Sequence, residues 1–206
     1  MAESTPAPAS RDKEQIAAHA PLVLASASPR RRELLAILTG AFSVEPADLD
    51  ESLLDGEAPG AYVERIAREK AEAIAARRAD RFVLGADTSV VLDGVCLGKP
   101  GDSDEARRML NALSGRRHEV YSAVSLIGPE VRPRSALSVT EVEFDMLPSA
   151  WVDRYIDSGE PMDKAGAYAV QGRAAAWVKE LQGSYSGVVG LPLYETGKLL
   201  REARLI

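Results

Sequence analysis

One segment, residues 82–92, constrains the fold of this chain more than any other, because it is apolar along most of its length and holds a carboxylate near its middle. The pattern predicts a strand over residues 82–86, and the following Asp93-Gly94 pair predicts a two-residue hairpin between two further strands. Burying a carboxylate without a partner is costly, so Asp87 must meet a cation, a metal ion or several hydrogen-bond donors. Gly85 allows a ligand or another stretch of backbone to approach closely at this point.

The rest of the chain alternates between helical and strand-like patterns. The predicted strands are residues 22–26, 42–45, 119–127, 136–145 and 174–181, and the predicted helices are residues 29–39, 60–79, 103–114, 148–158 and 192–204. Helices interleaved with pairs of strands favour an α/β fold with a mixed β-sheet and flanking helices. A chain of 206 residues forms one domain, or one domain with two lobes, and can bury a sizeable core without disulfides or a structural metal.

Residues 1–20 mix Ala, Pro, Ser and charged residues without a sustained apolar period, which predicts a disordered tail ahead of one folded domain over residues 21–206. The formal net charge of −6 argues against binding to a nucleic acid polymer, although a local basic pocket is compatible with it. A single cysteine, no signal peptide and no apolar run of about 18 residues predict a cytoplasmic protein that does not bind membranes.

The chain has two histidines, too few for a structural Cys/His zinc site. His19 falls in the predicted tail, and His118 lacks the nucleophile-elbow sequence of a serine hydrolase. Any chemistry is therefore expected to depend on carboxylates and cations.

The sequence Ser26-Ala27-Ser28-Pro29-Arg30-Arg31 follows an apolar strand and opens a predicted helix. Pro29 suits the first helical position and Ser28 the cap before it. Such a junction offers free backbone N–H groups and the positive end of the helix dipole, and arginine adds a fork that matches phosphate oxygens. The segment is therefore a candidate phosphate site, and the alternative is a capped helix whose basic first turn only faces solvent.

Lys70 lies on the same face of the predicted helix 60–79 as Val63, Ile66 and Ile74. Its ammonium group either points into a cleft toward anionic groups or extends past the edge of the core to solvent. Two weaker candidates follow the same logic: Lys99 at the end of a strand, and Glu51 in an acidic loop with Asp48 and Asp50.

A carboxylate placed like that of Asp87 is a candidate general base or metal ligand, and the alternative is a structural aspartate that binds turn amides. The glycine-rich segment 159–172 is too polar for a core strand and long enough to be functional. Within it, the Gln171 amide could hydrogen-bond the edge of a base and Tyr168 could stack or pack, whereas the alternative is a plain connection.

Together, SASPRR at 26–31, EKA at 69–71, GADT at 85–88, GKP at 98–100, DKAGAY at 163–168, QG at 171–172 and SY..VVGLPL at 184–193 resemble the Maf family of nucleoside triphosphate pyrophosphatases. The resemblance implies a fold like that of the inosine triphosphatase group, with two lobes around a central cleft, in a homodimer. It also implies hydrolysis of a nucleoside triphosphate to the monophosphate and pyrophosphate with Mg²⁺ or Mn²⁺. The sequence DKAGAYAVQG looks like the branch that acts on dTTP and UTP rather than on 7-methyl-GTP.

Carried over to this chain, the resemblance implies that Asp87 accepts the proton. It further implies substrate-binding positions at Ser26, Arg30, Arg31, Thr88, Lys164 and Gln171, catalytic cations at Lys70 and Lys99, and metal ligands at Asp87 and Glu51. Two other functions stay open at this point. One is a non-enzymatic regulator of cell division and septum formation that binds a nucleotide without turning it over. The other is a pyrophosphatase that removes non-canonical nucleotides, which rests on likeness of fold alone.

Overall fold

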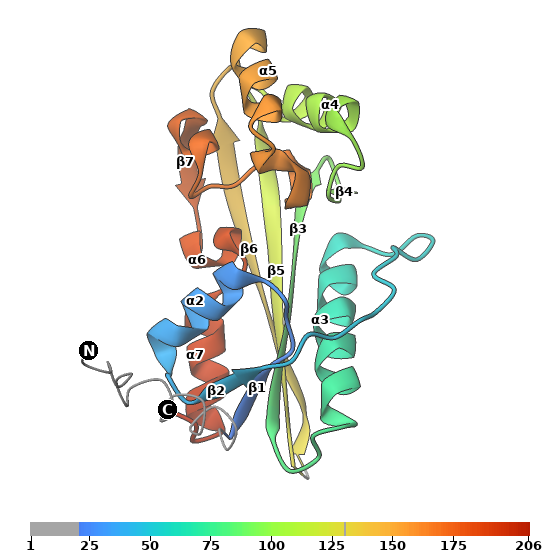
Figure 1. Cartoon of the computed structure of the whole chain (residues 1–206), viewed down its shortest axis with the longest axis vertical. Coiled ribbons are helices and arrows are strands. Elements are labelled where there is room, and N and C mark those ends of the chain that lie inside the picture. Colours follow the sequence, from blue (N-terminus) through green and yellow to red (C-terminus); the bar gives the residue numbers. More distant parts are fainter. Residues whose placement is uncertain (1–20, 130) are drawn as a thin grey trace, which may run out of the picture.

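The computed structural model describes residues 21–129 and 131–206. A mixed sheet forms the frame, with strand order β2-β1-β3-β5-β6-β7 and β4 paired to β3 (Figure 1). The strands are β1 (Leu22–Leu24), β2 (Phe42–Val44), β3 (Phe82–Leu92), β4 (Val95–Leu97), β5 (Arg117–Gly128), β6 (Val131–Phe144) and β7 (Val178–Gln182). Because β1 is parallel to β2 and β3 while the other pairs are antiparallel, the predicted mixed sheet is confirmed.

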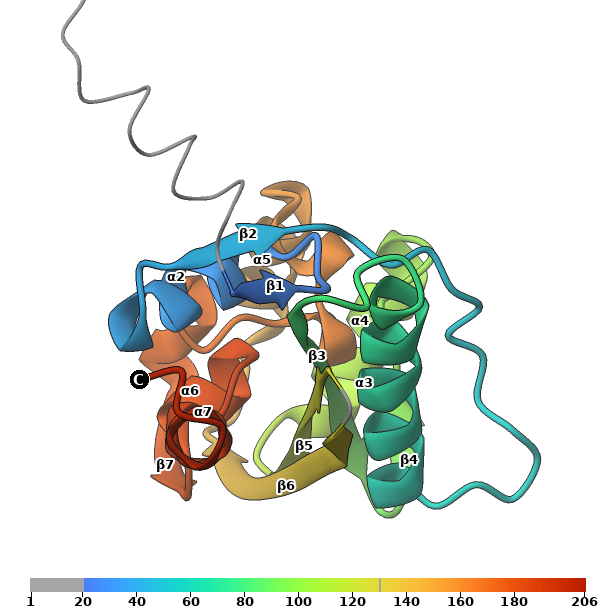
Figure 2. The same cartoon turned by 90° about the horizontal axis from the view of Figure 1, so that it is seen from below.

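Helices flank this sheet, as Figure 2 shows from one end of the molecule. They are α2 (Pro29–Leu38), α3 (Pro59–Ala75), α4 (Ser103–Leu113), α5 (Ser149–Asp157), α6 (Tyr185–Val189) and α7 (Leu193–Glu202), with the 3₁₀ turns η1 (Glu160–Asp163), η2 (Ala165–Ala167) and η3 (Arg173–Trp177). Within the described ranges, none of the helices has the length and apolar character needed to cross a membrane. The tail predicted over residues 1–20 lies outside the described residues.

The long strands β3, β5 and β6 run through both halves of the molecule (Figure 1). At one end, Val90 of β3 belongs to a core cluster with Leu110 of α4. At the other end, Leu84 of β3 belongs to a separate cluster with Leu35 of α2. The polar residues 87–89 lie on β3 between these two clusters. The strand that joins the two lobes therefore carries polar side chains between the two hydrophobic cores.

The neighbours of β3 leave an opening at that place. β5 pairs with β3 from Val83 to Val91, whereas on the opposite edge β1 pairs only with Phe82–Leu84 and β4 only with Val90–Leu92. Among the described residues, no strand covers this edge at positions 85–89. The gap exposes the polar centre of β3 to the segment that leaves β1.

Gly85 brings α3 against this part of the sheet. A Cβ atom added at Gly85 would lie 2.0 Å from the carbonyl oxygen of Ala67 and 2.8 Å from the backbone nitrogen of Ala71. Only glycine allows this separation, since such distances are far below van der Waals contact. The predicted close approach is therefore an approach of helix backbone, and it sets Lys70 beside the strand.

Five elements differ clearly from the sequence predictions. β3 is one strand of 11 residues, because its long pairing with β5 holds Gly85 and the polar residues in the ladder. The helix predicted over 60–79 ends at Ala75, where Arg77 and Arg78 donate to carbonyls three residues back. The strand predicted over 174–181 begins only at Val178, since the preceding alanines lack the branched side chains that favour strands. The short helix α6 was missed, and α7 ends at Glu202.

Candidate active site

A pocket of about 690 Å³ opens between the lobes, where β3 lacks a strand neighbour. Its lining includes every residue predicted for the site, namely Ser26, Arg30, Arg31, Glu51, Lys70, Asp87, Thr88, Lys99, Lys164 and Gln171. Five cationic side chains and three carboxylates line the pocket, an excess of two positive charges in a chain of net charge −6. The volume lies in the range of small-molecule sites, and the local charge suits an anion.

Lys70 and Asp87 form a buried ion pair at the floor of this pocket. The Nζ atom of Lys70 lies 2.8 Å from Oδ1 of Asp87 and 2.9 Å from Oε1 of Glu51. Lys70 is 7% exposed, so the interpretation that its ammonium group extends to solvent is wrong. Asp87 binds this ammonium group rather than turn amides, and in the described chain its second oxygen, Oδ2, accepts no hydrogen bond.

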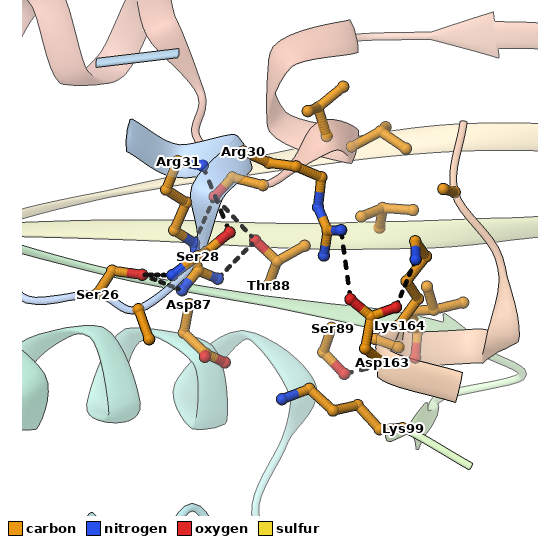
Figure 3. Close-up of a pocket in the computed structure, with 18 of the residues that line it drawn as sticks. Ser26, Ser28, Arg30, Arg31, Asp87, Thr88, Ser89, Lys99, Asp163 and Lys164 are labelled. Atoms are coloured by element: carbon orange, nitrogen blue, oxygen red, sulfur yellow. Dashed lines mark hydrogen bonds and ion pairs between the residues drawn. The ribbon is translucent and has the colours of Figure 1, made fainter. Parts of the chain in front are cut away.

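The loop after β1 forms the wall opposite this pair. The Ser28 side chain accepts a hydrogen bond from the backbone nitrogen of Arg31, which confirms the predicted helix cap. The N-terminus of α2 therefore faces the pocket, with Ser26 and Arg30 beside it (Figure 3). Since the first turn contains no acidic residue, the positive end of the dipole is not neutralised locally.

The guanidinium group of Arg31 connects three segments. It donates to the Gly190 carbonyl at 2.8 Å, to Oγ of Ser26 at 3.4 Å and to Oγ1 of Thr88 at 3.4 Å. The Thr88 hydroxyl in turn lies 3.0 Å from the Ser122 hydroxyl of β5. Burial lowers the pKa of Arg31, and the nearby negative charge of Asp87 opposes this shift. Arg31 and Thr88 thus form part of the rigid wall of the pocket.

Arg30 and Asp163 face each other across the pocket in an ion pair of 3.6 Å (Figure 3). Asp163 also accepts a hydrogen bond from Nζ of Lys164 at 2.5 Å. Burial alone would raise the pKa of Asp163, but the hydrogen bond from Lys164 and the charge of Arg30 outweigh it, so its pKa is lowered. Two of the predicted cations therefore share one carboxylate, which a phosphate group would have to replace.

Lys99 holds a different position from the paired cations. The Gly166 backbone nitrogen donates to the Gly98 carbonyl at 3.0 Å, which ties η2 to the segment that follows β4. Lys99 extends from this segment along the pocket (Figure 3) and, among the residues described, makes no hydrogen bond or ion pair. Its exposed ammonium group is available to an incoming anion.

Gln171 and Tyr168 come from the glycine-rich segment but differ in environment. Gln171 is exposed at the pocket, and within the described ranges its side-chain amide has no hydrogen-bond partner. The Tyr168 hydroxyl lies 2.7 Å from Nε2 of His118, and its ring packs edge-on against Phe144. Tyr168 therefore packs into the core of one lobe, while Gln171 stays free to contact a ligand.

Sequence reasoning missed several residues of the lining, including Tyr62, Ser89, Asp163 and the Gly190 backbone. The Tyr62 hydroxyl donates to the Glu51 carbonyl at 2.9 Å and so holds the acidic loop near Lys70. Burial, with the negative charges of Asp87 and Glu51, raises the pKa of Tyr62 to about 12. Its spacing of two helical turns from Lys70 is the signal that could have indicated this position.

The carboxylates of the site can be compared with what a divalent cation needs. The described residues contain no group of three or more His, Cys, Asp or Glu side chains that could hold a metal ion by themselves. Asp87 and Glu51 both lie within 3 Å of Nζ of Lys70, so they converge on one point. Mg²⁺ is commonly bound by one or two carboxylates together with substrate phosphates. The donor set fits a cation that arrives with a phosphate ligand.

A two-lobed α/β fold, a helix N-terminus and a basic pocket around a buried carboxylate define a class of protein that binds small polyanions. Residues 21–203 match the family model described as "Maf-like protein", so the chain belongs to the Maf family. The family resemblance inferred from the motifs is confirmed.

Curated relatives cover most of the chain. A dTTP/UTP pyrophosphatase from Anaeromyxobacter dehalogenans is 56% identical over 188 residues, which cover 88% of this chain and 93% of the relative. A dTTP/UTP pyrophosphatase from Myxococcus xanthus is 54% identical over 185 residues, with 89% and 93% covered. Among solved structures, a HAM1 protein from Coxiella burnetii shares 20% identity at a TM-score of 0.49, with 88% of this chain and 98% of that chain covered.

Proposed function

We propose that this protein is a nucleoside triphosphate pyrophosphatase that hydrolyses dTTP and UTP to the nucleoside monophosphate and pyrophosphate. The observation that carries the proposal is the ion pair of Lys70 and Asp87, buried at the floor of a pocket with an excess of positive charge. A carboxylate that can act as a general base, beside a site that stabilises negative charge, suits the hydrolysis of a phosphoanhydride. The relatives named as dTTP/UTP pyrophosphatases support the same reaction and substrates.

The triphosphate is placed along the cations of the pocket. The N-terminus of α2 offers backbone N–H groups beside Ser26, and Arg30 and Lys99 offer charge from opposite sides. These groups come from separate elements. The N-terminus of α2 is in position before a ligand binds, whereas Arg30 has to exchange the Asp163 carboxylate for a phosphate oxygen. Lys99, which lacks a protein partner in the described residues, neutralises the charge that develops on the leaving pyrophosphate.

Asp87 orients the attacking water and takes its proton. Lys70 holds Oδ1 at 2.8 Å and so fixes the rotamer of the carboxylate. Oδ2, which accepts no hydrogen bond within the described residues, is the atom that accepts the proton. Arg31, bound to Gly190 and Thr88, keeps the wall above this carboxylate in place.

A divalent cation, Mg²⁺ or Mn²⁺, belongs to this proposal as a ligand of Asp87 and Glu51. When bound with the triphosphate, it would neutralise charge on the phosphate oxygens. Lys70 contacts both carboxylates and keeps them from separating by mutual repulsion. Glu51 is the more exposed of the two and is held through its loop by Tyr62.

In this proposal the base lies toward Gln171, and Thr88 and Arg30 contact the nucleotide between its base and its phosphates. Uracil and thymine present a carbonyl, an imide N–H and a second carbonyl, and an amide side chain can donate to a carbonyl and accept from the imide. Cytosine reverses part of this pattern, and a site built on such bonds rejects the mismatched base. Lys164, which lies beside Asp163, contributes a further positive charge to the pocket.

The test is release of pyrophosphate from a panel of nucleoside triphosphates with Mg²⁺ or Mn²⁺. We expect turnover of dTTP and UTP well ahead of CTP, dCTP and the purine nucleotides, and none without a divalent cation. Binding of nucleotides without turnover would instead support the regulator of cell division. Preference for ITP or XTP would support the removal of non-canonical nucleotides. Preference for 7-methyl-GTP would contradict the assignment to the dTTP/UTP branch of the family.

The cellular setting and assembly are part of the proposal. One cysteine and a net charge of −6 support a cytoplasmic enzyme of small nucleotides rather than a protein that binds nucleic acid polymers or membranes. The homodimer follows from the family resemblance, and light scattering of the purified protein tests it.

A further inference from the structure

Gln171 is presented by a turn that other residues hold in place. The Gly172 backbone nitrogen donates to the Ala169 carbonyl at 3.1 Å, which closes a four-residue turn with Gln171 at its third position. The side chain of Gln171 has no hydrogen-bond partner in the described chain, so nothing orients it except the backbone that carries it. Any residue that fixes this turn therefore fixes where the amide of Gln171 points.

Two side chains outside the pocket lining do so. The Tyr155 hydroxyl of α5 accepts a hydrogen bond from the Ala169 backbone nitrogen at 3.3 Å and donates to Oε1 of Glu160 at 3.1 Å. The same Oε1 atom accepts a hydrogen bond from the Arg173 backbone nitrogen at 3.0 Å. Tyr155 thus binds Ala169 at the start of the turn, and Glu160 binds Arg173 just after its end. The two side chains also bind each other.

Packing shows that this arrangement is tight. A Cβ atom added at Gly172 would lie 1.9 Å from Oε1 of Glu160, so the carboxylate rests directly against the turn. The Tyr155 side chain is 1% exposed, which anchors the hydroxyl in the core of its lobe. Glu160 also accepts a hydrogen bond from Nζ of Lys164 through its backbone carbonyl at 2.7 Å.

We infer that the Tyr155 hydroxyl and the Glu160 carboxylate are positioning groups for base selection, which act on the substrate through Gln171. The inference rests on the proposed function, in which Gln171 reads the pyrimidine edge. Misplacement of a hydrogen-bonding group by about 1 Å is enough to cost about 10²-fold in rate. The loss should fall on discrimination between bases, because neither residue lines the part of the pocket that holds phosphate.

The experiment measures the ratio of kcat/KM for dTTP to kcat/KM for dCTP. We expect Glu160→Ala to lower this ratio by about 10- to 100-fold, and Glu160→Gln, which keeps an acceptor oxygen, to retain more of it. Arg173→Ala is the matched control, since it removes the side chain near Glu160 at 3.9 Å but keeps the backbone nitrogen that donates to it. Its ratio should equal that of the wild type.

Gln171→Ala separates this inference from the proposed function. In a Gln171→Ala background, Glu160→Ala should cause no further loss of discrimination. If the ratio is lowered in Gln171→Ala but unchanged in Glu160→Ala, the inference is wrong and the proposed function stands. The same conclusion follows if the losses of the two variants add in the double variant. An unchanged ratio in Gln171→Ala itself would overturn the base-reading role in the proposed function and the inference with it. If Glu160→Ala does not fold, Tyr155→Phe removes the shared hydroxyl and must lower the ratio in the same way.

Discussion

Lys70 and Asp87 form an ion pair of 2.8 Å in which both side chains are less than a tenth exposed. Lys70 lies on the buried face of α3 among Val63, Ile66 and Ile74, and Asp87 lies in the largely apolar strand β3. A buried pair of this kind contributes little net stability compared with apolar side chains of the same size, whereas removal of one partner is strongly destabilising. Its presence is therefore explained by the chemistry of the pocket.

Asp87→Asn is expected to lower kcat by about 10²- to 10⁴-fold, because an amide cannot take a proton from water. The fold should remain, since the amide oxygen still accepts from Lys70 and Glu51 still balances its charge. Steady-state kinetics and thermal unfolding measure the two effects. Glu143→Gln, which alters a carboxylate in surface ion pairs with Arg117 and Lys179, is the control. A rate above half of the wild type would show that Asp87 is structural.

Lys70→Met is expected to lower stability as well as activity. It leaves the Asp87 carboxylate buried without its cation, a change that costs about 3–5 kcal/mol when a buried pair is broken. Adding Asp87→Asn to this variant should recover most of the free energy of unfolding and none of the activity. Urea denaturation measures the free energy of unfolding of each variant. A Lys70→Met variant as stable as the wild type would contradict the claim that Lys70 neutralises a buried Asp87 carboxylate.

Gly85→Ala is expected to destabilise the protein and disturb the site together. The added methyl group would lie 2.0 Å from the Ala67 carbonyl oxygen, so α3 must move away from β3. Overpacking of this kind costs about 1–3 kcal/mol, and the shift separates Lys70 from Asp87. Gly40→Ala serves as the control, because nothing lies within 4 Å of its Cβ position. Equal melting temperatures for the two variants would show that the contact between α3 and β3 can relax without cost.

The buried imidazole of His118 is expected to make the stability of the protein depend on pH. Burial lowers its pKa from the ordinary value of 6.5 to about 4, and within the described residues its Nδ1 atom has no hydrogen-bond partner. Below pH 6.5 the unfolded chain takes up a proton at His118 that the folded protein does not. The contribution of His118 to the free energy of unfolding is therefore complete above pH 6.5 and is lost as the pH falls toward 4.

The loss between pH 8 and pH 5 is expected to be about 2 kcal/mol from this group alone. His118→Gln keeps a polar partner for Tyr168 and removes the titration, so its free energy of unfolding should fall less over the same interval. Urea denaturation at several pH values measures the difference. Parallel pH profiles for the two proteins would mean that His118 is accessible to protons in the folded state.

Local rules predicted much of the site. The cap at Ser28, the face of α3 that carries Lys70 and the turn at Asp93-Gly94 each depend on residues a few positions apart, and the structure confirms all three. Those rules also predicted the mixed sheet, since most helices and strands have their own apolar period.

What local rules missed depends on distant contacts. Arg31 binds the carbonyl of Gly190, 159 residues away, and Arg30 binds Asp163 from the opposite side of the pocket. The continuity of β3 across its polar centre depends on pairing with β5, and the turn that carries Gln171 depends on side chains from α5 and η1. A short-range sequence pattern cannot predict these contacts, because they depend on the tertiary structure of the whole chain.

The most direct test of the account is to identify the products of dTTP hydrolysis by phosphorus NMR, with Mg²⁺ present and with wild type and Asp87→Asn in parallel. We expect dTMP and pyrophosphate in equal amounts from the wild type, and formation of both at least about 100-fold slower from Asp87→Asn. Formation of dTDP and orthophosphate, or the same products at similar rates from both proteins, would contradict the account.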